Sequence, residues 1–361
     1  MKAAILYETN ADLVVEEISI RKPVGREVLV KTSYAGLCHS DLHFIQGLYP
    51  HPLLVVPGHE AAGIVEAVGP DVTYVKPGDH VITCLAVFCG SCESCLSGKP
   101  GICVNPEVKP SPGAGKELEW EKPAQLNKFM NLSSFAEQML VHENALAKIR
   151  KDMPLDRAAL IGCGVLTGFG AVANTASVRP GETVAVIGCG GVGMAAVNGA
   201  VIAGAGRIIA IDTNPAKLQL AAKLGATDLI NPNDGDPVKQ VVDLTKGGVH
   251  HAVECLGLKA TAEQAFRMTA RGGAATIVGM VPFGINIEVH GLDLLYERRL
   301  QGSMMGGGSF RTDMPRLIEL YMQGRLHLDD WISDRITLEE INKGFSAMKS
   351  GVGMRSVIEF Q

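Results

Sequence analysis

Residues 183–193 read TVAVIGCGGVG and decide the fold of this chain. An apolar strand is followed by glycines at 188, 190 and 193, which satisfy G-x-G-x-x-G between a strand and a helix. The first glycine permits a tight turn, the second lets the backbone approach a pyrophosphate, and the third lets the helix pack on the strand. Glycine turns also open helices that bind nothing, but this context predicts a dinucleotide site with contacts from Gly188, Gly190, Gly191, Val192 and Gly193.

The next apolar strand, RIIAI, is followed by Asp212, 24 residues after Gly188. A carboxylate at this place accepts hydrogen bonds from ribose hydroxyls and repels the 2′-phosphate of NADP. The following Thr213 and Asn214 offer no cation to such a phosphate. The sequence therefore predicts NAD as the cofactor; the alternative is that Asp212 only caps the next helix.

Apolar strands alternate with helical segments over residues 165–304. This alternation predicts a doubly wound parallel sheet. The six strand candidates are TVAVIG, RIIAID, DLI, HAVEC, AATIVG and LQGSMM. Residues 1–164 instead contain short β runs separated by Gly and Pro, and 105–131 reads as a long surface loop. The tail, 305–361, has two helical segments and a closing strand, RSVIEF. We therefore expect an α/β protein with a β-rich part and a parallel-sheet part.

Composition excludes several classes of protein. The chain has 361 residues, a length typical of two domains, with 20% charged residues and a formal net charge of -5. A nucleic-acid binder is therefore not expected. The N-terminus lacks the long apolar segment of an export signal, and no apolar stretch of about 18 residues follows. We expect a cytoplasmic protein that does not enter a membrane.

Four of the nine cysteines crowd into residues 89–103. Four thiolates at this spacing can close a tetrahedral shell, which is typical of a structural zinc site. The alternative is a set of reduced or disulfide-bonded cysteines. Because such clusters in large cytosolic chains favour metal, we predict a structural-zinc lobe whose ligands are Cys89, Cys92, Cys95 and Cys103.

Cys38 and His59 both lie beside apolar runs and could face one cleft. A catalytic zinc needs about three protein ligands and an open position. The residues alone do not choose a third ligand, since Cys84, Cys163, Cys189 and Cys255 are all available. An isolated Cys or His is also often a core residue.

The chain resembles the zinc-dependent alcohol dehydrogenases of the medium-chain dehydrogenase/reductase superfamily along essentially its whole length. GHEAAGIVEAVG, the spaced cysteines and GCGGVG carry the resemblance. It implies a GroES-like catalytic domain over 1–164 and 305–361, a Rossmann NAD-binding domain over 165–304, and two zinc ions per chain. It also implies that Cys38, His59 and Cys163 hold the catalytic zinc.

The resemblance further assigns roles around that zinc. Ser40 and His43 would relay the alcohol proton through the cofactor ribose to solvent, Asp41 would hydrogen-bond His59, and Glu60 would lie near the metal. The implied cofactor contacts are Thr167 near the nicotinamide, Arg355 and His39 at the phosphates, and Lys217. His39 stands where many relatives carry an arginine.

We expect an NAD-dependent alcohol dehydrogenase that oxidises medium-chain, allylic or aromatic primary alcohols to aldehydes. Its predicted pocket residues are Tyr49, Leu85, Phe135 and Met304, and the apolar ones favour hexanol or benzyl alcohol over ethanol. The alternatives are a glutathione-dependent formaldehyde dehydrogenase, a polyol dehydrogenase, a zinc-free reductase, and a non-catalytic zinc and nucleotide sensor. The family resemblance favours a homodimer, with a homotetramer as the alternative.

Overall fold

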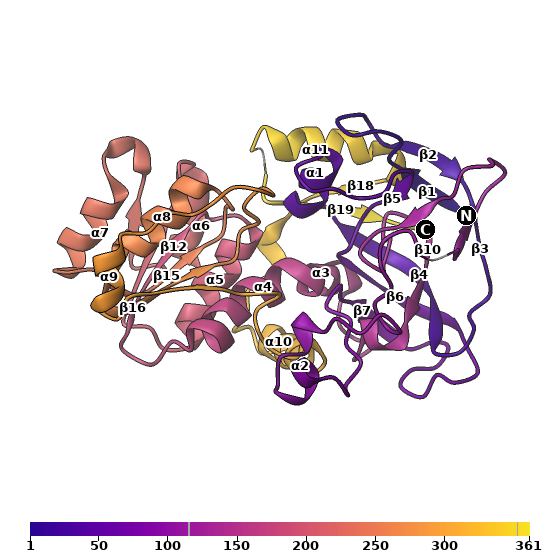
Figure 1. Cartoon of the computed structure of the whole chain (residues 1–361), viewed down its shortest axis with the longest axis horizontal. Helices are drawn as coiled ribbons and strands as arrows, with labels where there is room; N and C mark the ends of the chain where they lie inside the picture. The colour runs from indigo at the N-terminus through magenta and orange to yellow at the C-terminus, as the bar shows by residue number, and fades with distance from the viewer. Residues whose placement is uncertain (115, 352) are drawn as a thin grey trace. The chain divides into compact units, whose positions relative to one another are not determined.

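The computed structural model describes residues 1–114, 116–351 and 353–361 (Figure 1). The chain divides into two compact units. The first unit joins Met1–Cys163 to Ser309–Gln361, and the second is Gly164–Gly308. The domain boundaries expected after residues 164 and 304 lie close to these limits.

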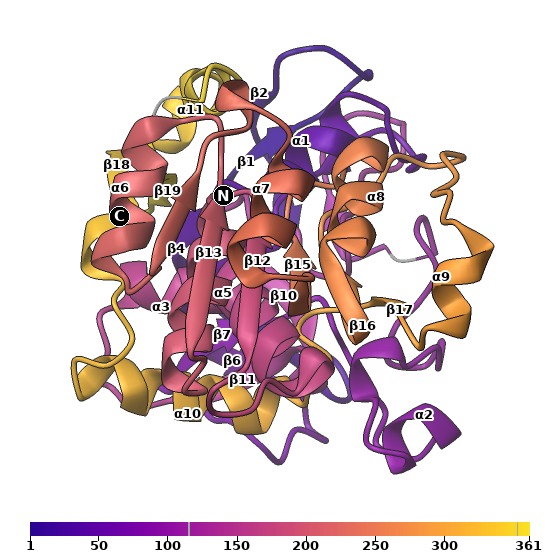
Figure 2. The same cartoon turned by 90° about the vertical axis from the view of Figure 1, so that its left-hand side faces the viewer.

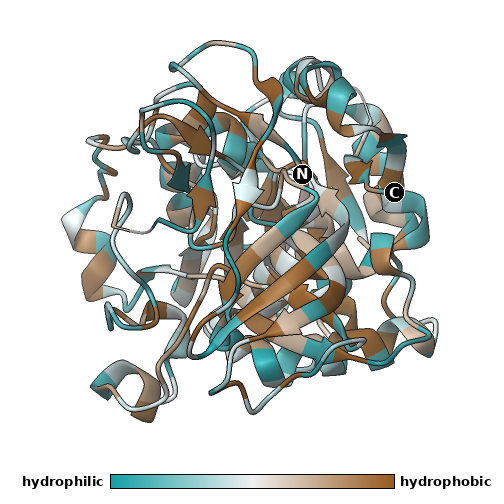
Figure 3. Ribbon diagram, turned by 90° about the vertical axis from the view of Figure 1, so that its right-hand side faces the viewer, coloured by the Kyte–Doolittle hydropathy of each residue, from teal (hydrophilic) through white to brown (hydrophobic). Residues whose placement is uncertain are grey.

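The first unit is built on an antiparallel sheet around β4 (Glu27–Gly36). β4 pairs with β6 (Ala61–Val68), β10 (Gln138–His142) and β19 (Arg355–Glu359), so residues from both ends of the chain form one sheet. Inward-facing Val28, Val30 and Thr32 of β4 are fully buried, and Lys31, between Val30 and Thr32, is exposed. This alternation of burial is what a sheet with one covered face requires. Figure 3 colours each residue by its hydropathy and shows both apolar and polar residues along the strands.

The other elements of this unit are short. Its remaining strands are β1 (Lys2–Ile5), β2 (Val14–Glu17), β3 (Ser19–Ile20), β5 (Val55–Val56), β7 (His80–Thr83), β8 (Leu118–Glu119), β9 (Asn127–Lys128), β11 (Leu146–Ile149) and β18 (Ile332–Ile336). Its helices are α1 (His39–Ile45), α2 (Glu93–Leu96), α3 (Leu155–Leu160), α10 (Phe310–Met322) and α11 (Ile341–Lys349), with 3₁₀ turns at Pro100–Ile102, Glu143–Ala145, Asp329–Trp331 and Leu338–Glu340. The loop expected over 105–131 thus contains β8 and β9, and residue 115 lies outside the described residues.

The second unit is a parallel sheet in the order β14-β13-β12-β15-β16-β17. Figure 2 shows strands of this sheet side by side. The strands are β12 (Thr183–Ile187), β13 (Arg207–Ile211), β14 (Asp228–Ile230), β15 (Val249–Glu254), β16 (Thr269–Ile277) and β17 (Arg299–Gly302). The connecting helices are α5 (Gly191–Ile202), α6 (Pro215–Lys223), α7 (Pro237–Thr245), α8 (Lys259–Met268) and α9 (Gly291–Leu295), with a 3₁₀ turn at Pro232–Asp234. The strand order reverses between β12 and β15, where ligands of doubly wound sheets bind.

One helical stretch was not expected from the sequence. Residues 155–176 form a continuous helix of α3, a π-helical segment (Ile161–Val165), α4 (Leu166–Gly170) and a second π-helical segment (Ala171–Ala176). Its several glycines hide the helical pattern in the sequence. It is long and apolar enough to cross a membrane, contrary to the expectation that no such stretch exists, but 78% of its most apolar window is buried inside the protein. It therefore has the burial of a core helix.

Candidate active site

Three elements bring Cys38, His59 and Cys163 together in the first unit. Cys38 precedes α1 at its N-cap, His59 lies in the turn before β6, and Cys163 lies in the π-helical segment of the long helix. All three side chains are buried. π-Helical turns are rare and frequent at functional sites, since they turn a side chain out of the regular helical register.

The geometry of this cluster fits a metal ion. The sulfurs of Cys38 and Cys163 and a ring nitrogen of His59 all lie within 4.8 Å of one another. His59 Nε2 is 3.3 Å from Cys163 Sγ, and a tetrahedral zinc separates a sulfur and a nitrogen ligand by about 3.6 Å. The neighbouring Cys163 thiol holds the pKa of Cys38 well below its usual value, which favours the thiolate that a metal needs.

The structure also decides among the four cysteines that were candidates for the third position. Among the described residues, only Cys163 joins Cys38 and His59 in such a group. Burial raises the pKa of Cys84 and of Cys189 to about 12, and raises that of Cys255 well above its usual value. None of these three lies in such a group among the described residues.

Asp41 fixes which nitrogen of His59 is free. Its Oδ1 lies 2.7 Å from His59 Nδ1, and both side chains are fully buried. A carboxylate accepts, so Nδ1 carries the hydrogen and Nε2 directs a lone pair toward Cys163. This is the tautomer that a metal ligand requires. Asp41 also accepts from the Cys38 backbone N–H, which holds the start of α1.

Glu60 and Arg355 form a buried ion pair beside the cluster. Arg355 donates from a guanidinium nitrogen to Glu60 Oε1, although the sequence assigned Arg355 to the cofactor phosphates. The two side chains form an ion pair because each is a buried charge that needs a partner of opposite sign. Burial raises the pKa of Glu60 to about 7 against the opposing effect of Arg355.

Ser40 and His43 lie three residues apart on α1 and therefore on neighbouring positions of one helix face. Ser40 Oγ is 3.7 Å from Cys38 Sγ. His43 stacks on Tyr49, and its buried Nδ1 has no hydrogen-bond partner within the described parts of the chain. Burial lowers the pKa of His43, which keeps the ring neutral and able to accept a proton. His39, at the start of α1, is exposed.

A second cluster contains Cys89, Cys92, Cys95 and Cys103, again within 4.8 Å of one another. Their sulfur separations of 3.5 Å, 3.8 Å and 3.9 Å match the edge of about 3.8 Å that a tetrahedral zinc–thiolate site requires. None of the four forms a disulfide. The Ser91 hydroxyl and backbone N–H lower the pKa of Cys89 to about 5. Four sulfurs leave no open position, so this site fits a structural metal.

The glycine turn of the second unit has the form that a dinucleotide site needs. Gly188 has φ of 89°, and a Cβ on Gly193 would lie 1.7 Å from the Gly188 carbonyl oxygen. Glycine is therefore required at both positions. Asp212 Oδ2 accepts from the Cys189 N–H at 2.7 Å, which places the carboxylate beside the turn.

The other predicted cofactor residues of this unit lie as follows. Gly190 is the N-cap of α5, which begins with Gly191 and Val192. Thr167 is buried, and its hydroxyl donates to the Met305 sulfur. Lys217 lies on α6. Its charge is close enough to the Cys189 thiol to lower the pKa of that thiol, although burial raises this pKa more strongly.

Comparison with known proteins identifies the family. Residues 25–151 match the alcohol dehydrogenase GroES-like domain, and residues 191–323 match the zinc-binding dehydrogenase family. An S-(hydroxymethyl)glutathione dehydrogenase of Photobacterium damsela subsp. piscicida is 42% identical over 99% of both chains. The chain belongs to the zinc-dependent alcohol dehydrogenase family. The predicted α/β class, with a GroES-like part and a Rossmann-type parallel sheet, is confirmed, and the chain is an oxidoreductase.

Two solved structures of this alcohol dehydrogenase family are similar over the whole chain. An alcohol dehydrogenase zinc-binding domain protein from Burkholderia ambifaria is 37% identical with a TM-score of 0.94, covering 100% of this chain and 98% of that one. The benzyl alcohol dehydrogenase of Acinetobacter calcoaceticus is 35% identical with a TM-score of 0.93, covering 100% and 99%. The two cysteine-containing clusters fit the two zinc ions expected for such a dehydrogenase.

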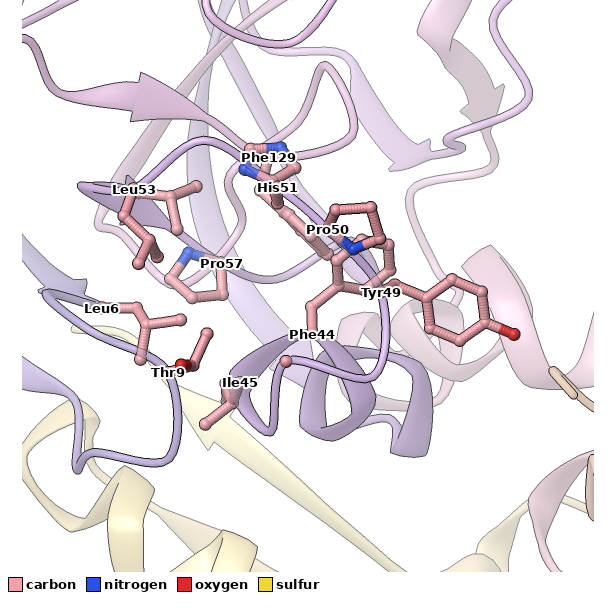
Figure 4. Close-up of a pocket in the computed structure, with 12 residues that line it drawn as sticks. Leu6, Thr9, Phe44, Ile45, Tyr49, Pro50, His51, Leu53, Pro57 and Phe129 are labelled. Atoms are coloured by element: carbon pink, nitrogen blue, oxygen red, sulfur yellow. The ribbon is translucent and has the colours of Figure 1, made fainter. Parts of the chain in front are cut away.

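The aromatic wall near the catalytic cluster includes a residue that the sequence analysis missed. The Phe129 ring lies 6.3 Å from that of His59 and lines a cavity of about 150 Å³, which Tyr49 also lines (Figure 4). Phe135, predicted for this role, is instead fully buried in the core and packs edge-on against Phe345. The two phenylalanines are six residues apart in one irregular segment, so the sequence alone does not show which faces the site.

The other two pocket predictions have different surroundings. Leu85 is half-buried against the core of the first unit, and Met304 in the second unit is 44% exposed. A larger cavity of about 460 Å³ shares Phe44, Pro50 and His51 with the first one. Its wall includes Lys109, Glu117 and Lys128 from the loop over 105–131. Charged side chains thus lie beside an otherwise apolar pocket.

Proposed function

We propose that this alcohol dehydrogenase catalyses the NAD-dependent oxidation of a primary hydroxyl group to an aldehyde, and that its substrate is the hydroxymethyl adduct of a thiol such as glutathione. The observation that carries the reaction is the buried group of Cys38, His59 and Cys163 with a serine hydroxyl next to it. Three ligands leave a fourth position for a substrate oxygen, which distinguishes a catalytic site from the closed four-cysteine cluster.

When bound, zinc supplies a Lewis acid that lowers the pKa of an alcohol, and NAD supplies the hydride acceptor. The protein's own residues position the substrate and take its proton. Ser40 Oγ accepts the hydroxyl proton while its own hydrogen passes on toward the neutral imidazole of His43, which lies on the same helix face and takes up the proton. The Asp41 carboxylate keeps His59 in the tautomer that holds the metal. The aromatic ring of Phe129 excludes water from one side of His59.

Two observations support the thiol adduct as the substrate. The relative from Photobacterium, 42% identical over 99% of both chains, is named for its action on S-(hydroxymethyl)glutathione. The larger cavity presents Lys109, a cation that suits a carboxylate of a peptide-like tail, beside the ion pair that Lys128 and Glu117 form with each other. Lys109 therefore offers a cation for that tail.

The second candidate is an apolar primary alcohol, as the sequence analysis expected. The structural neighbour from Acinetobacter is a benzyl alcohol dehydrogenase, and the smaller cavity is lined mainly by apolar side chains such as Phe44, Phe129 and Leu53. Burial of a phenyl or alkyl tail there would stabilise the complex by about 0.8 kcal/mol per methylene. This candidate predicts that catalytic efficiency rises from ethanol to hexanol or benzyl alcohol.

One assay separates these candidates. Purified protein is mixed with NAD and formaldehyde plus glutathione, benzyl alcohol, hexanol or ethanol, and NADH absorbance is followed. The proposal predicts the highest kcat/KM for the glutathione adduct; a higher value for benzyl alcohol would favour the second candidate. Ser40→Ala should abolish turnover with every substrate, whereas Ser350→Ala, at an exposed position after α11, should leave turnover unchanged. Absence of NADH formation with all four would refute the reaction itself.

A further inference from the structure

The side chain of His51 has a hydrogen-bonding group that nothing in the described structure uses. Its Nδ1 lies 2.9 Å from the Pro52 carbonyl oxygen. A carbonyl only accepts, so Nδ1 carries the hydrogen and Nε2 holds a lone pair when the ring is neutral. Burial lowers the pKa of His51, which favours the neutral ring. Nε2 is buried, and among the described residues it has no hydrogen-bond partner.

This unpaired acceptor belongs to the substrate side of the molecule. His51 lines both the 150 Å³ and the 460 Å³ cavities. Its ring packs against Phe129 at 5.3 Å and against Phe44 at 6.1 Å, and Figure 4 shows it beside Phe129 in the pocket wall. Buried polar atoms without a partner are uncommon in native proteins, and those that persist often await a ligand or a water.

We propose that His51 determines specificity by accepting, at Nε2, a hydrogen bond from a donor on the tail of the substrate: an amide N–H, an ammonium or a second hydroxyl. This inference rests on the proposed oxidation of a primary alcohol. The donor belongs to the tail and not to the reacting hydroxyl, because His51 is not part of the metal cluster: its ring packs against Phe129 at 5.3 Å, and the Phe129 ring lies 6.3 Å from that of His59.

The chemistry of the surrounding wall narrows the substrate class. Leu6, Ile45 and Leu53 make the smaller cavity apolar, with the Thr9 side chain also in its wall. The part of a tail that enters this pocket is therefore mostly apolar and has a donor within reach of His51. S-(hydroxymethyl)glutathione has amide N–H groups, whereas benzyl alcohol and hexanol have no donor besides the reacting hydroxyl. His51 thus favours the first substrate class over the second.

A pair of variants tests the acceptor separately from the packing. His51→Phe keeps an aromatic ring against Phe129 and removes the acceptor, whereas His51→Gln removes the ring and keeps an acceptor. The substrates are 1-hexanol and 1,6-hexanediol, which differ in one terminal hydroxyl. We expect the ratio of kcat/KM for the diol to that for hexanol to fall about tenfold in His51→Phe and to return to about the wild-type value in His51→Gln. An equal ratio in all three proteins would overturn the proposal.

A measurement without turnover tests the same acceptor. In protein labelled with ¹⁵N-histidine, the Nε2 resonance of His51 is identified by its absence from the spectrum of His51→Phe. This resonance should be that of an unprotonated nitrogen. It should shift when 1,6-hexanediol is added but not when hexanol is added. A protonated Nε2, or the same response to both alcohols, would contradict the proposal. If the protein oxidises no alcohol, the proposed function fails while this spectrum still decides whether His51 accepts from a ligand.

Discussion

The Nδ1 atom of His59 lies 2.7 Å from Oδ1 of Asp41, and neither side chain is exposed. Asp41 therefore acts on the metal site through the tautomer of His59. Asp41→Asn preserves the shape but can present an N–H to Nδ1, which moves the imidazole hydrogen to Nε2 and opposes metal binding. We expect the zinc affinity of this site to fall about 10- to 100-fold, measured by competition with a chelator. The exposed Asp12→Asn is the control, and an unchanged affinity in Asp41→Asn would contradict the assignment.

The four-cysteine cluster should bind its own zinc independently of catalysis. Cys92→Ser removes one of four sulfurs, so metal analysis should give about one zinc per chain in place of about two, together with a lower Tm. Cys84→Ser is the matched control, because Cys84 is a buried thiol outside both clusters. An identical zinc content in Cys92→Ser and wild type would show that the four-cysteine cluster does not bind zinc.

Asp212 should set the choice between NAD and NADP. Its carboxylate lies beside the glycine turn, where it would repel a 2′-phosphate. Asp212→Gly should raise the ratio of kcat/KM for NADP to that for NAD by about tenfold or more, since opposed like charges cost several kcal/mol. The exposed Asp234→Gly in the same unit should leave the ratio unchanged. A wild-type enzyme that prefers NADP would refute the role of Asp212.

Asp156 should make the first unit sensitive to acid. Burial raises the pKa of Asp156, but hydrogen bonds from Arg335 at 2.6 Å and Arg157 at 2.7 Å outweigh it, so the folded pKa is below the usual value. The stabilisation is therefore present above about pH 4 and is lost as the pH falls through the folded pKa. Asp156→Asn should lower Tm at pH 7 by about 4 °C, since loss of a charged hydrogen bond costs about 1.5 kcal/mol.

The pH dependence of this difference is the sharper test. Thermal unfolding of wild type and Asp156→Asn should converge as the pH falls below about 4, because both side chains are then neutral. Asp152→Asn, which breaks an exposed pair with Arg150, should not change Tm measurably. A difference that stays constant down to low pH would show that Asp156 does not act through its charge.

The homodimer remains a prediction, and the second unit shows where to test it. β17 is an edge strand, and the adjacent α9 and preceding loop expose large apolar side chains. Phe283 is 75% exposed and Leu295 is 79% exposed. Such a patch beside an open edge suits pairing with a second copy about a two-fold axis. Leu295→Asp should shift the molar mass measured by light scattering toward that of the monomer. Leu96→Asp, in the structural-zinc lobe, should leave the molar mass unchanged. A wild-type monomer would refute the dimer.

The parts of this enzyme that follow from local patterns could be predicted from the sequence. The glycine turn, the parallel strands and the four-cysteine cluster depend on residues close together in the chain. The partner of Arg355 and the position of Phe129 could not be predicted, because Glu60 is 295 residues away from Arg355 and Phe129 lies in an irregular segment. β18, which pairs in parallel with β19, was missed because its three central residues are exposed and polar.

The pairing of β19 with β4 has a consequence for how the chain is made. β4 is synthesised before the dinucleotide-binding unit and β19 after it, so the sheet of the metal-binding unit stays incomplete until β19 has been made. The dinucleotide-binding unit, Gly164–Gly308, is continuous and can fold while the ribosome is still adding the tail. During that interval the cysteines of the two metal-binding clusters are free thiols in an incompletely folded unit. The nascent enzyme thus depends on a reducing environment and on a supply of zinc until β19 pairs with β4.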